Sequence, residues 1–271
     1  MNSNVIQQRV ALASDPGHWV HVSEGPRHVR VIFNGEILAD SRHAKLVRET
    51  DVLPVYYFPQ ADVHRNFLAA SPYKTECPYK GAASYWSINV GDKRAENATW
   101  SYEAPLPEAA DIANYFAFEW NKMDKWMEED EEIFVHPRDP YKRVDVLQSS
   151  RHVKVVIAGQ TIADSRRPRL LFETNHPVRY YLLEEDVRMD LLVPSVTRSC
   201  CPYKGAASYW SVRVDSQLYE DMVWGYMEPI PECPKIKGLL CFFHERGADI
   251  CVNGEEIPRP QTKWARPLKR K

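Results

Sequence analysis

The string CPYKGAASYWS at residues 77–87 returns without a single change at residues 201–211. Matched positions lie 124 residues apart, and this offset holds without a gap from HVR at 28–30 to the W-x-Y-x-x-P-x-P block that begins at Trp100. Such a period is too long for a solenoid repeat and fits a duplicated domain of ordinary size. The sequence therefore predicts two homologous domains, and the residues that both copies keep are the more informative ones.

Composition places the chain among globular proteins with room for two cores. Of its 271 residues, 44% are hydrophobic and 27% are charged, without a long low-complexity tract. The 35 basic and 37 acidic residues nearly cancel, so a general surface for nucleic acid is not expected. The first residues lack the basic start and apolar core of a secretory signal, and no apolar run approaches the roughly 20 residues that span a bilayer. We therefore expect no membrane partner.

The cysteines argue against both a disulfide framework and a zinc site. The first copy has a single cysteine, Cys77. The second copy has five, and Cys201 is the one that matches Cys77. A framework that belonged to the duplicated domain would appear in both copies. Because no C-x-x-C pair occurs either, we expect no metal, no cofactor and a reduced, cytoplasmic protein.

Alternating apolar residues predict strands at matching places in both copies. Residues 29–33 alternate, Asn34-Gly35 is a two-residue hairpin turn, and the second copy repeats this arrangement over residues 153–162. Residues 62–68 are expected to form one or two helical turns. β-Branched and aromatic residues predict further strands at residues 45–48, 55–58, 85–90 and 98–102.

One short helix and two more strands complete each predicted copy. Pro107 with the acidic residues after it predicts a helix start, and the helix is expected to cover residues 107–116. Residues 117–120 and 125–127 are expected to form a hairpin, because the matching stretch 241–252 has the pattern of strand, glycine turn and strand. The expected fold is mainly β, in the β-rich α+β class. It consists of two tandem homologous domains like small β-barrels or β-tents, each with one short helix.

The repeat also predicts where the domains begin and end. A basic tail can be a weak targeting or anion-binding signal, but a solvated, disordered end is more common and is expected here. The expected parts are an N-terminal segment at 1–26, a first repeat domain at 27–135, a linker at 136–150, a second repeat domain at 151–258 and the basic tail at 259–271.

Four motifs are shared by both copies: ADSR at 39–42, YY-x-x-x-x-DV at 56–63, CPYKG-x-A-x-YWS, and W-x-Y-x-x-P-x-P. Together they resemble the domain of unknown function 427 family, which is also labelled nucleotidyltransferase-like. The resemblance covers most of the chain and implies a compact β-rich domain without a known reaction. Nucleotidyl transfer commonly uses two metal-binding carboxylates near a Gly-Ser loop, and neither feature is visible in these residues.

Lys80 and Lys204 are the main candidate catalytic residues, since both copies keep them in a run of Tyr, Cys, Pro and Trp. A solvated loop lysine is the plain structural alternative. In an apolar cavity, the amine could have a lowered pKa and act as a base or Schiff-base amine, or it could pair with an anionic ligand. The other candidate catalytic residues are Tyr85, Tyr209, Glu49 and Glu173.

The motif aromatic residues are numerous enough to form either a core or the wall of a pocket. In each adjacent Tyr-Trp pair, strand geometry points the two side chains to opposite faces, so only one of them faces the core or cavity. We therefore expect a mixed role. The candidate ligand-binding aromatic residues are Tyr79, Tyr203, Trp86, Trp210, Trp100 and Trp224.

Cys77 and Cys201 are also ligand-binding candidates, although a small buried cysteine is the more common case. A nucleophilic cysteine needs a nearby base, and the shared histidine, His28 or His152, lies at a strand start without an evident link to it.

Two charged pairs complete the predicted site. Arg42 and Arg166 follow a strand in an Asp-Ser-Arg turn, where they could clamp a carboxylate or phosphate, while a locally hydrogen-bonded turn is the structural alternative. Asp62 and Asp186 are alternatives to the glutamates as the acidic partner of the motif lysine. Asp62 could instead cap the short helix that follows it.

Three classes of function remain open from the sequence. The first is a metal-independent enzyme that acts on a small carbonyl or carboxylate compound by lysine–tyrosine acid–base chemistry. The second is a non-catalytic binder or sensor of a small molecule or anion, and the third is a protein-interaction scaffold. Both copies keep the whole polar set, which favours a pocket over a scaffold. The sequence does not separate enzyme from binder, because a bound anion and a reacting one need similar groups.

Overall fold

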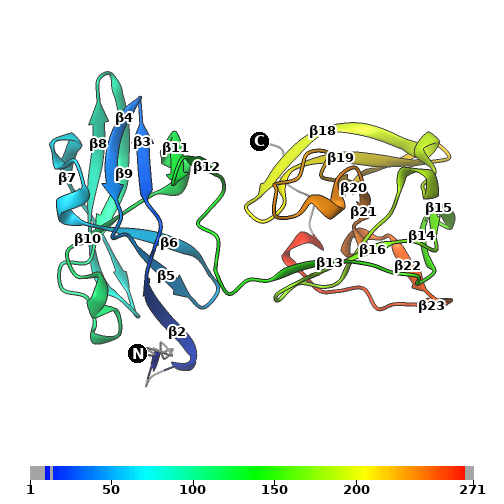
Figure 1. Ribbon diagram of the computed structural model, residues 1–271, viewed down its shortest axis with the longest axis horizontal. Coiled ribbons are helices and arrows are strands. Elements are labelled where there is room, and N and C mark those ends of the chain that lie inside the picture. The colour runs from blue at the N-terminus through cyan, green and yellow to red at the C-terminus, as the bar shows by residue number, and fades with distance from the viewer. Residues whose placement is uncertain (1–9, 13–14, 266–271) are drawn as a thin grey trace. The chain divides into compact units, whose positions relative to one another are not determined.

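The computed structural model of the chain describes residues 10–12 and 15–265, and it divides into two compact units (Figure 1). The first unit is Met1–Asp139 and the second is Pro140–Lys271. Each unit carries one copy of the repeat.

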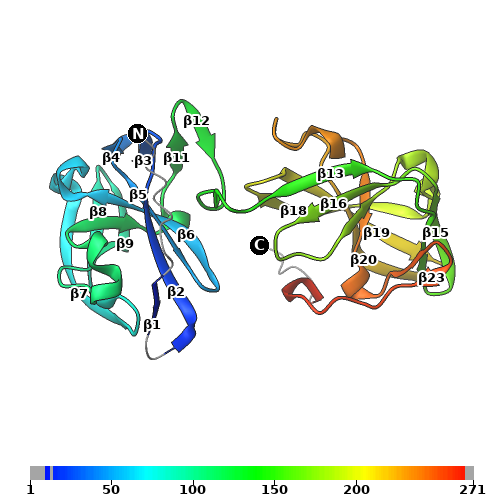
Figure 2. The same ribbon diagram turned by 60° about the horizontal axis from the view of Figure 1, so that its bottom comes forward.

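Two antiparallel sheets build the first unit (Figures 1 and 2). The large sheet has the order β1-β2-β5-β6-β10-β9-β8-β7, and the small sheet has the order β12-β11-β3-β4. The strands are β1 (Val10–Leu12), β2 (Asp15–Glu24), β3 (Val29–Phe33), β4 (Glu36–Ser41), β5 (Lys45–Glu49), β6 (Val52–Pro59), β7 (Leu68–Cys77), β8 (Gly81–Val90), β9 (Lys93–Ser101), β10 (Tyr115–Phe118), β11 (Lys125–Glu128) and β12 (Glu131–Ile133). The 3-10 helices are η1 (Gln60–Asp62), η2 (Arg65–Phe67), η3 (Pro107–Ile112) and η4 (Trp120–Lys122).

Among the described residues, the second unit repeats this strand order from β2 onward and has no counterpart of β1. Its large sheet consists of two parts, β13-β16-β17 and β21-β20-β19-β18. An isolated bridge between Leu182 and Leu240 joins β17 to β21. The small sheet has the order β15-β14-β22-β23. The common order confirms the prediction of two homologous, mainly β domains. The strands are β13 (Val144–Gln148), β14 (Val153–Ile157), β15 (Gln160–Ser165), β16 (Arg169–Glu173), β17 (Arg179–Tyr181), β18 (Leu192–Cys201), β19 (Gly205–Val214), β20 (Gln217–Gly225), β21 (Leu240–Phe242), β22 (Asp249–Val252) and β23 (Glu255–Glu256). The 3-10 helices are η5 (Glu184–Asp186), η6 (Met189–Leu191), η7 (Pro234–Ile236), η8 (His244–Arg246) and η9 (Lys263–Ala265).

The first hairpin of each unit forms where the sequence predicts it. Asn34 and Gly35 have φ of 48° and 81°, and Ala158 and Gly159 have φ of 49° and 78°. Two successive positive φ values define a turn whose twist suits a two-residue hairpin, and Asn-Gly adopts it readily. The strands predicted at 45–48, 55–58 and 85–90 are confirmed as parts of β5, β6 and β8, and β9 contains the fourth except for its last residue. The short helical segment at 62–68 consists of η2 and the end of η1.

Each unit buries two apolar clusters, one on either face of its large sheet. In the first unit, the sandwich core lies between the two sheets and includes Phe33 and Phe58. The other face carries a second group, the outer cluster, which includes Tyr57 together with Ile112 of η3. Adjacent β6 residues therefore belong to different clusters, as the alternation of a strand requires. The second unit has the same two clusters.

Three parts of the predicted architecture are wrong. The sheets are open and not closed into barrels within the described residues. The helix expected at 107–116 is a 3-10 helix that ends at Ile112, because Tyr115 already pairs in the large sheet. Residues 117–120 and 125–127 do not form a hairpin, since β10 pairs with β6 and β9 while β11 pairs with β3 and β12. The structure of this region depends on which distant strands β10 and β11 pair with. Local alternation of apolar residues does not predict those partner strands.

Strands also form at both expected domain margins. β2 lies in the predicted N-terminal segment 1–26, and β13 lies in the predicted linker 136–150, where it pairs with β16. Part of the predicted disordered tail is ordered as well, since the Trp264 ring lies 5.0 Å from the His176 ring between centroids. Residues 266–271 of that tail lie outside the described residues.

Candidate functional site

The motif lysine of each unit forms a buried ion pair with the last glutamate of β5 or β16. Lys80 Nζ donates a hydrogen bond to Glu49 Oε2, and Lys204 Nζ donates one to Glu173 Oε2 at 2.5 Å. The two lysines are 8% exposed, and the glutamates are 8% and 9% exposed. Of the two acids that the sequence offers to each lysine, the structure places the glutamate beside it.

The turn that carries the lysine depends on the glycine after it. Gly81 and Gly205 have φ of 92° and 105°, a region that favours glycine. The carbonyl of Lys80 accepts a hydrogen bond from Leu106 N at 3.1 Å, which ties the turn to the segment after β9. A Cβ added at Gly205 would lie 3.3 Å from Glu228 O, closer than ordinary contact. The CPYKG string therefore holds the lysine in one direction at the end of a strand.

A second basic side chain reaches the other oxygen of each glutamate. His18 Nε2 lies 3.0 Å from Glu49 Oε1, and Lys142 Nζ lies 2.9 Å from Glu173 Oε1. These two basic residues occupy matched positions of the repeat, in β2 and just before β13. Sequence reasoning missed them because their residue types differ and both lie outside the expected domains. Only the constant offset could have linked them.

The motif tyrosine packs against this second basic residue in both units. The rings of His18 and Tyr79 are stacked, with centroids 3.4 Å apart and planes 8° apart. In the second unit, Lys142 Nζ lies 5.1 Å from the centroid of the Tyr203 ring, within the range of a cation–π contact. Tyr79 and Tyr203 are therefore placed next to the ion pairs.

The motif cysteine also lies beside the polar groups of the site. Cys201 lies near Lys204 and raises its pKa, and Cys77 lies near Tyr102. Burial, followed by the neighbouring thiol, raises the pKa of Tyr102, so its phenol is neutral at neutral pH and able to donate. All six cysteines are free thiols.

Tyr85 and Tyr209, the predicted acid–base residues, belong to the same outer clusters. Their hydroxyls lie 3.1 Å from Thr75 Oγ1 and 2.6 Å from Ser199 Oγ. Burial raises the pKa of Tyr209. The predicted residues that the structure gathers in the outer clusters are Cys77, Tyr79, Tyr85 and Trp100, with Cys201, Tyr209 and Trp224 in the second unit.

Six predicted residues lie elsewhere: Trp86, Trp210, Arg42, Arg166, Asp62 and Asp186. Trp86 packs into the sandwich core, with its ring centroid 4.9 Å from that of Phe116, because it alternates with Tyr85 along β8. Arg42 is exposed. Asp62 accepts a hydrogen bond from Ser41 Oγ at 2.6 Å and does not cap η2. The matching residues of the second unit behave in the same way.

The ion pair of the second unit is charged at neutral pH. Burial opposes the charge on Glu173, but Lys204, followed by His176 and Lys142, outweighs it and lowers the pKa of Glu173. Burial also opposes the charge on Lys204, but Cys201 and Glu173 outweigh it and raise the pKa of Lys204. The pKa of Lys204 is thus raised, the opposite direction to the option of a lowered pKa that the sequence left open. Its ammonium is a charge anchor and hydrogen-bond donor, whereas Schiff-base formation needs the free amine.

Both extremes of pH are expected to destabilise the second unit. The folded-state pKa of Glu173 lies below its ordinary 4.5, so its stabilisation is complete above about pH 4.5 and is lost as the pH falls through the folded-state value. The folded-state pKa of Lys204 lies above 10.5, so its contribution is complete below that pH and is lost as the pH rises further. Urea unfolding across the pH range measures both limbs. Glu173→Gln should flatten the acid limb, and an unchanged acid limb in that variant would contradict the assignment.

The described residues contain no group of three or more His, Cys, Asp and Glu side chains placed to hold a metal ion. The prediction that the protein binds no zinc is left to metal analysis of the purified chain. Across the same residues, no helix has the length and apolar character needed to cross a bilayer.

Comparison with known families gives two matched segments. A family model described as a domain of unknown function (DUF427) matches residues 21–129 and again residues 145–254. Each matched segment contains the glutamate, cysteine and lysine of its own ion-pair site, whereas His18 and Lys142 lie just before the matches. No curated protein matches the chain.

Proposed function

The chain belongs to the domain of unknown function 427 family in two tandem copies, and we propose that each copy binds a small carbonyl- or carboxylate-containing molecule at its Lys–Glu site. One observation carries the proposal. A buried, charged pair lies with phenol and thiol groups on the outer face of the large sheet, and both units repeat it. Burying two opposite charges has a desolvation cost, and its repetition in both units favours a binding site over a scaffold.

The groups of the site suit recognition of an oxygen-rich ligand. The lysine ammonium donates hydrogen bonds to a carbonyl or carboxylate oxygen, and the glutamate holds the ammonium in place. Neutral phenols donate without adding charge, while the aromatic rings supply apolar walls. Lys142 gives the second site two lysines for one glutamate, so the second unit carries the greater excess of positive charge. We therefore assign an anionic ligand to the second unit first.

Binding is favoured over catalysis by the protonation states. An acid–base catalyst at neutral pH needs a group whose pKa lies near the working pH. Burial alone would lower the pKa of Lys204, but Cys201 and Glu173 raise it above 10.5. Burial raises the pKa of Tyr209 above 10.0. The lysine and the phenol thus act as fixed donors, which serves a binder or sensor better than an enzyme.

Calorimetric titration with acetate and pyruvate is expected to show saturable binding that depends on the ion pairs. Lys80→Met alone would leave Glu49 Oε2 buried without its ammonium partner, so both members are replaced together, as Lys80→Met with Glu49→Leu. The matching variant of the second unit is Lys204→Met with Glu173→Leu. Each double variant should lose one site, and the two combined should lose all binding while the chain stays folded by circular dichroism.

An exposed Lys–Glu pair in the small sheet provides the matched control. Lys125 Nζ lies 3.3 Å from Glu132 Oε2, and both side chains are largely exposed. Lys125→Met with Glu132→Leu makes the same chemical change away from the outer cluster and should leave the titration unchanged. If the wild-type chain binds neither carboxylate, or if the combined variant binds as well as the wild type, the proposal fails and a scaffold takes its place.

A further inference from the structure

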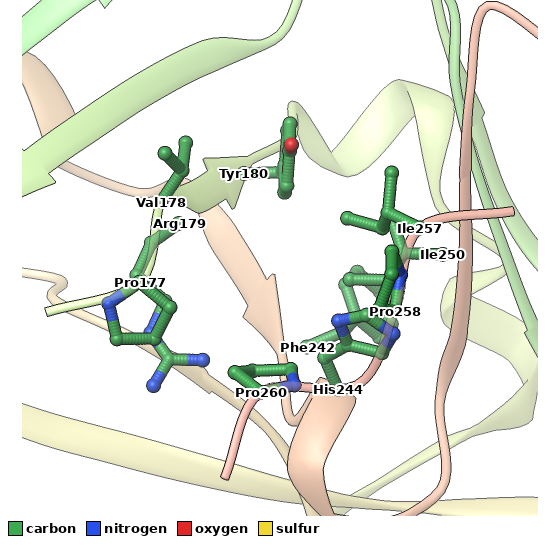
Figure 3. Close-up of a pocket in the computed structure, with 10 residues that line it drawn as sticks. All are labelled: Pro177, Val178, Arg179, Tyr180, Phe242, His244, Ile250, Ile257, Pro258 and Pro260. Atoms are coloured by element: carbon green, nitrogen blue, oxygen red, sulfur yellow. The ribbon is translucent and has the colours of Figure 1, made fainter. Parts of the chain in front are cut away.

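The second unit has a partly enclosed cavity of about 240 Å³ at the edge of its sandwich core (Figure 3). Tyr180, Phe242 and Ile250 line it from the core, and the remaining walls come from Arg179, from His244 of η8 and from the chain before β17 and after β23. In Figure 3, Val178 stands on one side of the open space and Ile257 on the other. None of the lining residues belongs to the Lys–Glu site, so this cavity is a separate feature.

The first unit has two tryptophans where this cavity has smaller side chains. Trp120 and Trp126 occupy the repeat positions of His244 and Ile250. Their indole rings are stacked, with centroids 4.4 Å apart and planes 6° apart. Trp126 is 3% exposed and belongs to the sandwich core of its unit. The same fold therefore packs planar bicyclic rings at this place in one unit and leaves space in the other.

His244, which lines the cavity, carries a buried ring nitrogen that the described part of the fold leaves unpaired. His244 is 5% exposed, and within the described residues its Nε2 has no hydrogen-bond partner. Leaving such an atom unpaired costs free energy that a ligand would recover. Burial lowers the pKa of His244, so the imidazole is neutral at neutral pH. In the tautomer that carries its proton on Nδ1, Nε2 accepts a hydrogen bond.

The cation that lines the cavity is already paired. Arg179 Nη1 donates to Glu245 Oε2 at 2.9 Å, and Glu245 also accepts a hydrogen bond from Thr262 Oγ1 at 2.9 Å. Because the guanidinium and this carboxylate neutralise each other, a ligand needs no charge of its own. Apolar walls with two uncharged polar groups, the Tyr180 hydroxyl and the His244 ring, suit an uncharged ring.

We propose that the second unit binds a small, uncharged, planar aromatic heterocycle in this cavity, with a ring N–H donating to His244 Nε2. The ring would lie where the first unit places the stacked indoles of Trp120 and Trp126. This site is independent of the Lys–Glu function proposed above, because the two share no residue.

Indole is the probe that tests this site, since it is the ring that the first unit packs there. NMR titration of the full chain should show one saturable site, with shifts at residues 177–180 and 257–260. Ile250→Trp should weaken indole binding about tenfold or more, because the added ring occupies the cavity. Benzothiophene has the shape of indole without the N–H and should bind the wild type about five-fold more weakly. His244→Phe should remove that preference.

Leu218→Trp is the control, because it adds the same ring at a 42% exposed position of β20. It should bind indole as the wild type does. The proposal is overturned if the wild type shows no saturable indole binding, if folded Ile250→Trp binds indole unchanged, or if folded His244→Phe keeps the preference for indole over benzothiophene. Should one cavity variant fail to fold, the other variant and the comparison of the two probes on the wild type still decide the matter.

Discussion

Replacing Glu49 by leucine is expected to lower the free energy of unfolding of the first unit by about 3–5 kcal/mol, although the change adds apolar surface. Glu49 and its partner Lys80 are both 8% exposed. Without the carboxylate, the ammonium is left buried without a counter-charge, which costs free energy unless the side chain reaches water. Urea unfolding measures the loss. Hydrogen exchange of peptides from β5 and β8 separates the first unit from the second.

Two further variants isolate the cause of that loss. Glu132→Leu removes a carboxylate that forms an exposed pair with Lys125, and it should cost less than about 1 kcal/mol. Glu49→Leu combined with Lys80→Met should recover most of the stability, because neither charge of the pair is left buried without its partner. A loss below about 1 kcal/mol in Glu49→Leu alone would mean that the lysine reaches water and that the pair is not buried in solution.

Much of the fold could be predicted because the chain contains its own comparison. A string repeated at a constant offset has to fold in the same way twice, so each local pattern is tested by its match. The turn at Asn34-Gly35 can be predicted from these two residues alone, because Asn-Gly favours a two-residue hairpin turn whatever the rest of the chain does. By contrast, the partners of β10 and β11 are strands far away in the sequence, and alternation alone does not identify them.

The missed strands carry loop-like residues. Asp15–Glu24 contains proline and glycine near its start, and two prolines precede Val144–Gln148, so composition favours turns and linkers there. Both segments become strands because β5 and β16 present an edge to them. Tertiary pairing thus overrides the local preference.

The candidate site could be predicted only in part for the same reason. Lys80 and Cys77 stand out because both copies keep them in one string, whereas the choice of Glu49 over Asp62 depends on which strand end lies beside the motif turn. Alternation along β8 did predict that Tyr85 and Trp86 separate, but it did not say which faces the outer cluster. His18 was invisible because it precedes the recognisable repeat.

Trp126→Ala is expected to lower the free energy of unfolding of the first unit by about 3–5 kcal/mol, the usual range for removing a buried tryptophan. The ring is 3% exposed and stacks on Trp120, and its centroid lies 6.2 Å from that of Phe58. Deletion removes apolar burial and leaves a cavity that strands of two sheets cannot close without shifting. Urea unfolding of the full chain, again resolved by hydrogen exchange, gives the value for the first unit.

The comparison variant for Trp126→Ala is Leu53→Ala, at a 55% exposed position of the same unit, which should change stability by less than about 0.5 kcal/mol. The second unit shows that this fold tolerates isoleucine at the matched position, Ile250, beside a cavity of about 240 Å³. A loss well under 2 kcal/mol in Trp126→Ala would therefore mean that the first unit relaxes toward the same open arrangement. The stacked indoles would then fill space between the sheets without contributing much to stability, because the sheets would keep their packing without them.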